Sequence, residues 1–121
     1  RILGFVNAPS LMQKTVEAAI RLNARVDVAN YQARRDALHD ILVRAGFDCP
    51  KPSGAFYLFP RSPLADDRAF ADAAARHNIL CVPGSAFGRP GYFRLAFCVG
   101  MPVILRSADA FAALGKDLGL I

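Results

Sequence analysis

Arg94 is the residue of this sequence whose surroundings most suggest chemistry, because it stands inside the apolar stretch YFRLAFCV, residues 92–99. The stretch predicts a β-strand, in which successive side chains point to opposite faces. Arg94 then shares a face with Ala96 and Cys98, whose small side chains leave it room to extend. Its planar fork can hold a carboxylate through two parallel hydrogen bonds, each worth about 1.5–3 kcal/mol. The alternative is a solvent-exposed arginine whose stem covers apolar surface, and both interpretations stay open on these residues alone.

The other reactive side chains do not form a catalytic set. His39 and His77 are expected to be surface or helix-capping residues, because neither has a convincing partner for a Ser/His/Asp triad. The three cysteines are odd in number and lack a CxxC spacing, which predicts buried, reduced thiols of a cytoplasmic protein and no metal site. The loop PGSAFG, residues 83–88, is only a weak phosphate-binding signal.

Composition argues against two classes of partner. The 121 residues carry 15 basic and 10 acidic side chains, but the basic residues are scattered, so we expect no nucleic-acid-binding face. Hydrophobic residues make up 54% of the chain, yet no apolar run approaches the roughly 18 residues of a membrane span. We therefore expect no membrane segment and attribute the excess to surface that a neighbouring domain covers. The start at Arg1, without a polar lead-in, is expected to mark a piece of a longer polypeptide.

Periodicity predicts a single α/β domain, in an α+β arrangement where a small sheet of about three strands packs with four helices. The strands are expected at residues 55–60, 79–82 and 92–99. The helices are expected after Asn7 as N-cap, from about Val28 to Ala45 behind the N-cap Asp27, from about 66 to 77, and from about 102 onward. Asp66 and Asp67 are expected in the first turn of the third helix, where they complement its dipole.

Three motifs occur in one order along the chain: YQARRDALHDILVRAGF at 31–47, PSGAFYLFP at 52–60 and VPGSAFGRPGYFRLAFCVG at 82–100. Together they closely resemble the C-terminal small domain of the class I/II pyridoxal-phosphate-dependent aminotransferases (fold type I, the aspartate aminotransferase superfamily). The opening RILGFVNAPSLMQ resembles a bacterial and archaeal branch of that superfamily. The resemblance implies that residues 1–121 are the small domain and that the large cofactor-binding domain lies outside this chain.

The resemblance also implies roles for particular residues. Arg94 matches the arginine that binds the substrate α-carboxylate, and Phe56 matches a position near the substrate-facing edge of the cleft. Asn7 matches a segment near the subunit interface of a homodimer. Gly84, Ser85 and Phe87 match the loop that moves with the small domain when the site closes.

The implied activity is transfer of an amino group between an amino acid and a 2-oxo acid, with pyridoxal 5'-phosphate bound mainly by the large domain. The lysine that binds this cofactor is expected upstream of Arg1, because none of the three lysines in the chain fits. We therefore expect no catalytic residue in this chain, and no activity from it alone. Two alternatives remain: a lyase or synthase of the same superfamily, and a freestanding basic α+β binding module, which would be a folded monomer with salt-sensitive affinity for nucleic acid.

Overall fold

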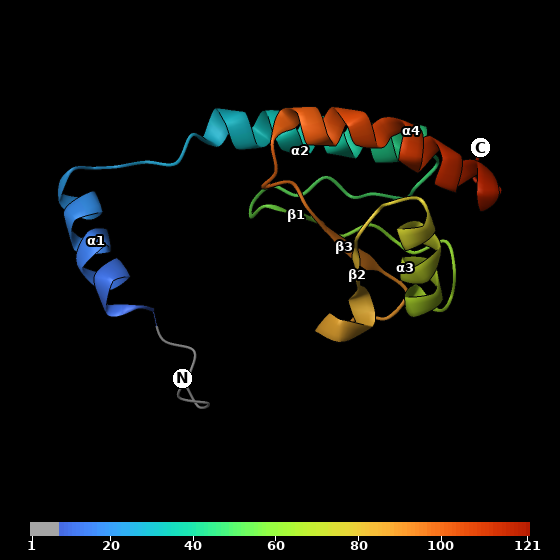
Figure 1. Ribbon diagram of the computed structural model, residues 1–121, viewed down its shortest axis with the longest axis horizontal. Helices are drawn as coiled ribbons and strands as arrows, with labels where there is room; N and C mark the ends of the chain where they lie inside the picture. Colours follow the sequence, from blue (N-terminus) through green and yellow to red (C-terminus); the bar gives the residue numbers. More distant parts are fainter. Residues whose placement is uncertain (1–7) are drawn as a thin grey trace.

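A computed structural model describes residues 8–121, which form four α-helices, three short β-strands and one 3₁₀ helix (Figure 1). This confirms the predicted α+β class with its small sheet and four helices. The elements in chain order are α1 (Ser10–Arg21), α2 (Val28–Arg44), β1 (Tyr57–Leu58), α3 (Asp67–Arg76), β2 (Val82–Pro83), η1 (Gly84–Phe87), β3 (Phe93–Ala96) and α4 (Met101–Asp117).

The sheet has the order β1-β3-β2, and both pairings are antiparallel. Tyr57 lies opposite Ala96, and Val82 lies opposite Arg94. Residues directly opposite each other share a face, so Tyr57, Val82, Arg94 and Ala96 lie on one side of the sheet. All four are exposed or half-buried, and we call this side the open face.

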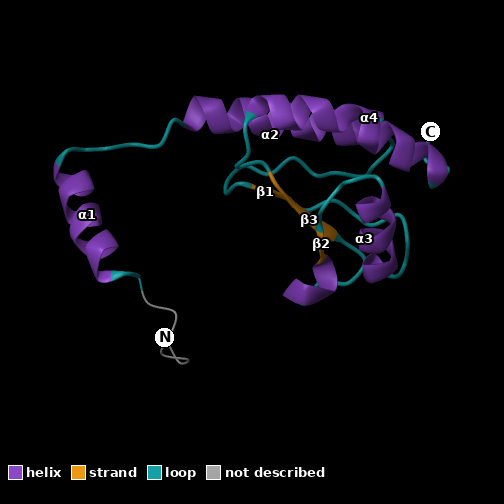
Figure 2. Cartoon of the chain, viewed as in Figure 1, coloured by secondary structure: helices purple, strands orange, loops and turns teal. Residues whose placement is uncertain are grey.

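The opposite side of the sheet carries the hydrophobic core, which α2, α3 and α4 complete (Figure 2). Phe93, Leu95 and Phe97 are buried there, which confirms the alternation predicted for this strand. Phe47 connects α3, β3 and α4. Its ring contacts those of Phe70, Phe93 and Phe111 edge to face at centroid distances of 6.0, 5.8 and 6.1 Å. Edge-to-face contacts of this kind add roughly 0.5–1.5 kcal/mol each beyond area burial.

The helix α1 differs from the other three because none of its residues is buried. In Figure 1 it lies apart from the sheet and from α2–α4, joined to them by the extended segment 22–27. Its apolar side chains, such as Leu11, Val16 and Ile20, are exposed. Pro9 occupies the N-cap position, and the predicted cap Asn7 lies outside the described residues.

Asp27 and Asn78 lie at helix ends, where their side chains suit the local backbone. The Asp27 carboxylate accepts a hydrogen bond from the Asn30 amide at 3.0 Å, which confirms it as the N-cap of α2. Asn78 has a φ of 60° at the end of α3, a left-handed conformation that asparagine tolerates better than most residues. No helix within residues 8–121 is long and apolar enough to cross a membrane.

Candidate functional site

Arg94 is half-buried in the central strand, and its guanidinium lies between two aromatic rings. The Cζ atom is 4.3 Å from the centroid of the Tyr57 ring and 4.1 Å from that of the Phe87 ring. Tyr57 belongs to β1 on one side of β3, whereas Phe87 follows β2 on the other side, so the two rings approach from two directions. We call Tyr57, Arg94 and Phe87 the arginine slot. Aromatic faces attract a guanidinium by about 0.5–2 kcal/mol each.

No acid neutralises this cation within residues 8–121, where none of the ion pairs includes Arg94. Aromatic rings cover the flat faces of a guanidinium and accept no conventional hydrogen bond from its edge. A guanidinium carries five N–H donors in its plane, and this geometry matches the two oxygens of a carboxylate. The arginine slot can therefore bind a planar anion edge-on.

Asp67 fixes the loop that supplies one wall of the slot. Its buried carboxylate accepts hydrogen bonds from the Ser85 amide at 2.8 Å, the Ser85 hydroxyl at 2.9 Å and the Gly91 amide at 3.2 Å. Burial raises the pKa of this carboxyl, but the hydrogen bonds from Ser85 and Gly91 outweigh burial, and the net pKa lies below the usual 3.8. The contacts of Asp67 with this loop were not predicted, because Asp66 and Asp67 look alike in the sequence.

Phe59 and Tyr92 form a chain of aromatic contacts that ends on the ring of Phe87. Phe59 meets Phe87 edge to face at 6.4 Å and stacks on Tyr92 at 5.7 Å. Arg89 covers the Tyr92 ring at 4.7 Å and donates a hydrogen bond to its hydroxyl at 3.2 Å. The Phe87 ring is nevertheless 48% exposed, so it depends on its backbone for a fixed position.

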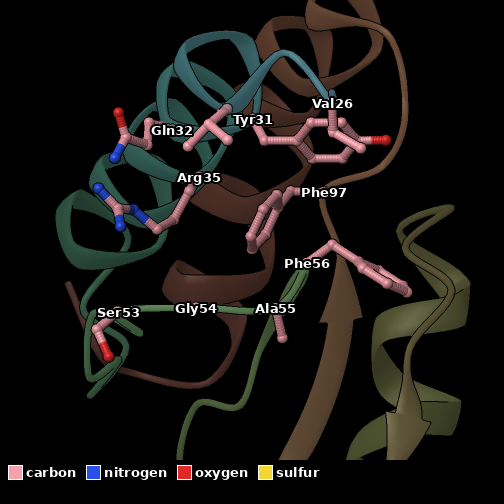
Figure 3. A pocket seen from close by; sticks show the side chains of 10 residues that line it. Val26, Tyr31, Gln32, Arg35, Ser53, Gly54, Ala55, Phe56 and Phe97 are labelled. Carbon is pink, nitrogen blue, oxygen red and sulfur yellow. The ribbon is translucent and has the colours of Figure 1, made fainter. Parts of the chain in front are cut away.

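Phe56 lies beside the slot, 43% exposed, with its ring 4.4 Å from that of Tyr57. It also lines a hollow of about 450 Å³ between the start of α2 and residues 53–56 (Figure 3). In Figure 3 the ring of Phe97, which also lines the hollow, is seen between Arg35 and Phe56. The substrate-edge role expected for Phe56 remains a prediction.

The histidines make structural contacts. The two ring nitrogens of His39 lie 3.1 Å from the Asp40 carboxylate and 3.1 Å from the Cys49 carbonyl oxygen, and His77 Nε2 lies 2.9 Å from Asp117. These contacts connect α2 to the following loop and α3 to α4.

The cysteines are not all buried. Burial raises the pKa of the Cys49 thiol, beside Asp48, and of the Cys81 thiol to about 11 in each case. Cys98 is exposed, so the prediction of burial was wrong for this residue. The reason is the alternation along the strand, which gives Phe97 the buried position and its neighbour the exposed one. Residues 8–121 contain no cluster of three potential metal ligands.

The comparisons with known proteins decide the family. The family model described as Aminotransferase class I and II matches residues 1–108. The chain belongs to this family. A probable N-acetyl-LL-diaminopimelate aminotransferase of Bacillus subtilis is 34% identical over 110 residues, which cover 84% of this chain and 28% of that protein. This aminotransferase chain thus spans about a quarter of the length of the curated relatives it matches.

Solved aminotransferases share its fold. A crystal structure of an aminotransferase from Eubacterium rectale matches with a TM-score of 0.81 and 38% identity, over 98% of this chain and 29% of that chain. An aspartate aminotransferase from Thermus thermophilus, solved with maleate, matches with a TM-score of 0.68 and 25% identity, over 84% of this chain and 26% of that chain.

The expectation that none of the three lysines binds the cofactor remains a prediction. Lys51 Nζ pairs with Asp36 at 3.1 Å, Lys14 is on α1, which has no buried residue, and Lys116 lies in the last turn of α4. None of the three belongs to the sheet or loop that forms the arginine slot.

Proposed function

We propose that residues 1–121 form the C-terminal small domain of a longer pyridoxal-phosphate-dependent aminotransferase, in which Arg94 binds the substrate α-carboxylate. The observation that carries the proposal is the Arg94 guanidinium, which two aromatic rings hold on the open face and which has no acidic partner among residues 8–121. Arg21 and Arg35 are the arginines within residues 8–121 that form ion pairs, and Arg94 is the one whose guanidinium contacts two aromatic rings. An arginine held in place but left unneutralised is suited to a ligand that brings its own negative charge.

Two further observations support the proposal. The chain spans about a quarter of the length of its curated relatives, and its open face and α1 present apolar side chains that a further domain would cover. The relative from Thermus thermophilus was solved with maleate, a dicarboxylate, which shows that a protein of this fold accommodates carboxylate ligands.

The proposed task of Arg94 is to bind and orient both substrates, since an amino acid and a 2-oxo acid share the α-carboxylate. Two parallel hydrogen bonds from one guanidinium fix the carboxylate plane and therefore restrict rotation of the attached Cα. The cofactor, held by residues outside this chain, supplies the electron sink for the chemistry at Cα. Movement of the small domain toward a bound substrate would exclude water from the site.

Several finer statements belong to this proposal. We infer a homodimer in the cytoplasm, with Asn7 near the subunit interface and Phe56 at the edge of the substrate cleft. A lyase or synthase of the same superfamily would use the same arginine, and the freestanding binding module is not favoured because the relatives are aminotransferases.

Replacing Arg94 by lysine in the full-length enzyme tests the proposal. Lysine keeps the charge but loses the planar fork, so we expect a raised KM for the amino acid and a fall in kcat/KM of about 10²-fold or more. Steady-state kinetics with a panel of L-amino acids measures this effect.

Arg106→Lys is the control, because Arg106 is an exposed arginine of α4 and belongs neither to the sheet nor to the loop that forms the slot. Its kinetics should stay close to those of the wild type. Unchanged kinetics for Arg94→Lys would exclude a carboxylate-binding role.

A further inference from the structure

We propose that Asp67 is a positioning residue for carboxylate binding. It acts on Arg94 through residues 84–91, which we call the η1 loop, and through the ring of Phe87. This inference rests on the function proposed above for Arg94. Asp67 lies on α3, outside β3 and the arginine slot, so the inference adds a residue of a further element to those that position Arg94.

Asp67 fastens the η1 loop at two separate points. Its carboxylate holds the backbone and the side chain of Ser85, two residues before Phe87, and also the backbone of Gly91. The same carboxylate therefore spans the segment 85–91, which leaves β2 and returns to β3. Asp67 is only 4% exposed, so these bonds are shielded from competing water.

The position of Phe87 depends on this fastening. The ring is 48% exposed, so packing alone does not fix it, and its aromatic contacts are with Phe59 and the Arg94 guanidinium. The loop backbone is tightly folded behind it: the Gly84 amide donates to the Tyr92 carbonyl at 2.7 Å, and Gly88 adopts a φ of 70°. A loop with this geometry and few buried side chains needs its hydrogen bonds to stay in one conformation.

Losing the Phe87 wall would free Arg94. Arginine has a long, flexible side chain, and the slot limits the orientations of its guanidinium before a ligand arrives. If Phe87 moves away, the guanidinium must be ordered when the carboxylate binds, and affinity falls. The chemistry at Cα is not affected directly, so the change should appear mainly in KM.

A purely helix-capping role does not account for these contacts. Asp66 already caps α3, because its carboxylate accepts hydrogen bonds from the Arg68 amide at 2.9 Å and the Ala69 amide at 3.3 Å. The hydrogen bonds of Asp67 go instead to Ser85 and Gly91 of the η1 loop. Asp66 is thus the matched control for Asp67, with the same side chain at the same helix end.

The experiment compares Asp67→Asn and Asp66→Asn in the full-length enzyme, using the L-amino acid that the wild type turns over best. Asparagine keeps the shape of the side chain, but it lacks the negative charge that strengthens all three hydrogen bonds, and its NH2 group cannot accept the one from the Ser85 hydroxyl. We expect Asp67→Asn to raise KM about 5- to 10-fold with kcat within about twofold of the wild type, and Asp66→Asn to leave both unchanged. An unchanged KM in folded Asp67→Asn would overturn the inference.

A double-mutant cycle with Phe87→Leu separates positioning from general loosening of the fold. If Asp67 acts through Phe87, the two changes are not additive, and the double variant has a KM close to that of Phe87→Leu alone. Additive effects on KM would contradict the proposed route. Should Asp67→Asn fail to fold, Ser85→Ala removes one of the same hydrogen bonds and is expected to raise KM about 2- to 3-fold; an unchanged KM there would count against the inference as well.

The kinetics of Arg94→Lys distinguish failure of this inference from failure of the proposed function. If Arg94→Lys impairs substrate binding but Asp67→Asn does not, only the positioning role is wrong. If neither change alters KM, the carboxylate-binding function of the slot is wrong, and the inference fails with it.

Discussion

At the scale of single residues, Arg94 and Arg35 show two different uses of the same side chain. Arg35 donates to the Asp36 carboxylate at 2.8 Å and to the Pro52 carbonyl at 3.1 Å, so its charge serves the structure. Hydrogen bonds from Arg35 and Lys51 lower the pKa of Asp36 in turn. Arg94 has aromatic neighbours instead of acidic ones. Arg34 and Arg89 also lie over one aromatic ring without an ion pair, but Arg94 is held by two rings in the central strand, which is the reason for assigning ligand binding to it.

The cysteines provide a prediction that the chain of residues 1–121 can test directly. Only the thiolate form of cysteine reacts readily, and Cys49 and Cys81 combine partial or full burial with a pKa of about 11. We expect about one rapidly reactive thiol per folded chain in a titration with a chromogenic disulfide at neutral pH, and all three in denaturant.

Cys98→Ser is the control for the thiol titration, because it should remove the fast phase and leave the two slow thiols. Rapid reaction of two or more thiols in the folded wild type would contradict the burial of Cys49 and Cys81.

Arg94 could be proposed as a site residue from the sequence, whereas Asp67 could not. The former stands out locally, as a cation in an apolar strand with small neighbours. The latter acts on Ser85 and Gly91, which are 18 and 24 residues away, and no local pattern reports such distant partners. The only available signal was a second aspartate next to Asp66, at a helix start that needs one cap.

At the scale of elements, Gly115 of α4 allows a close approach to Ala45 at the C-terminal end of α2. A Cβ atom added there would lie 2.4 Å from the backbone oxygen of Ala45, which cannot move without shifting the end of α2. Gly115→Ala should therefore lower the free energy of unfolding by at least about 1 kcal/mol, although alanine improves helix propensity by about that amount. Urea denaturation measures the change.

Gly54→Ala is the control for this substitution. No atom lies within 4 Å of the added Cβ, so we expect a neutral or slightly stabilising effect. A Gly115→Ala variant as stable as the wild type would show that the two helices are not packed as closely as described.

The elements were predicted well by type and less well by extent. The strands are two to four residues long, shorter than the predicted segments 55–60, 79–82 and 92–99, and β2 shares only Val82 with its predicted segment. Pro60 and Pro83 lack the N–H that a ladder requires, and pairing depends on partners that a single segment does not reveal. The apolar spacing of α1 correctly indicated a helix, but periodicity does not say against what a helix packs, and α1 buries none of its residues.

At the scale of the whole molecule, two surfaces with functional or apolar side chains are not covered by other elements of residues 8–121. One is the open face of the sheet with the arginine slot, and the other is α1 with exposed Leu11, Val16 and Ile20. Large exposed apolar surfaces usually have a partner. The proposed large domain would cover the open face and complete a cleft over Arg94, since this chain spans only about a quarter of the length of its relatives.

The most direct test is a crystal structure of the full-length enzyme with maleate. We predict that one carboxylate of maleate lies in the plane of the Arg94 guanidinium, between the rings of Tyr57 and Phe87, with two N–H···O distances of about 2.7–2.9 Å. A bound maleate that leaves the arginine slot empty, with its carboxylates on other cations, would contradict the central claim.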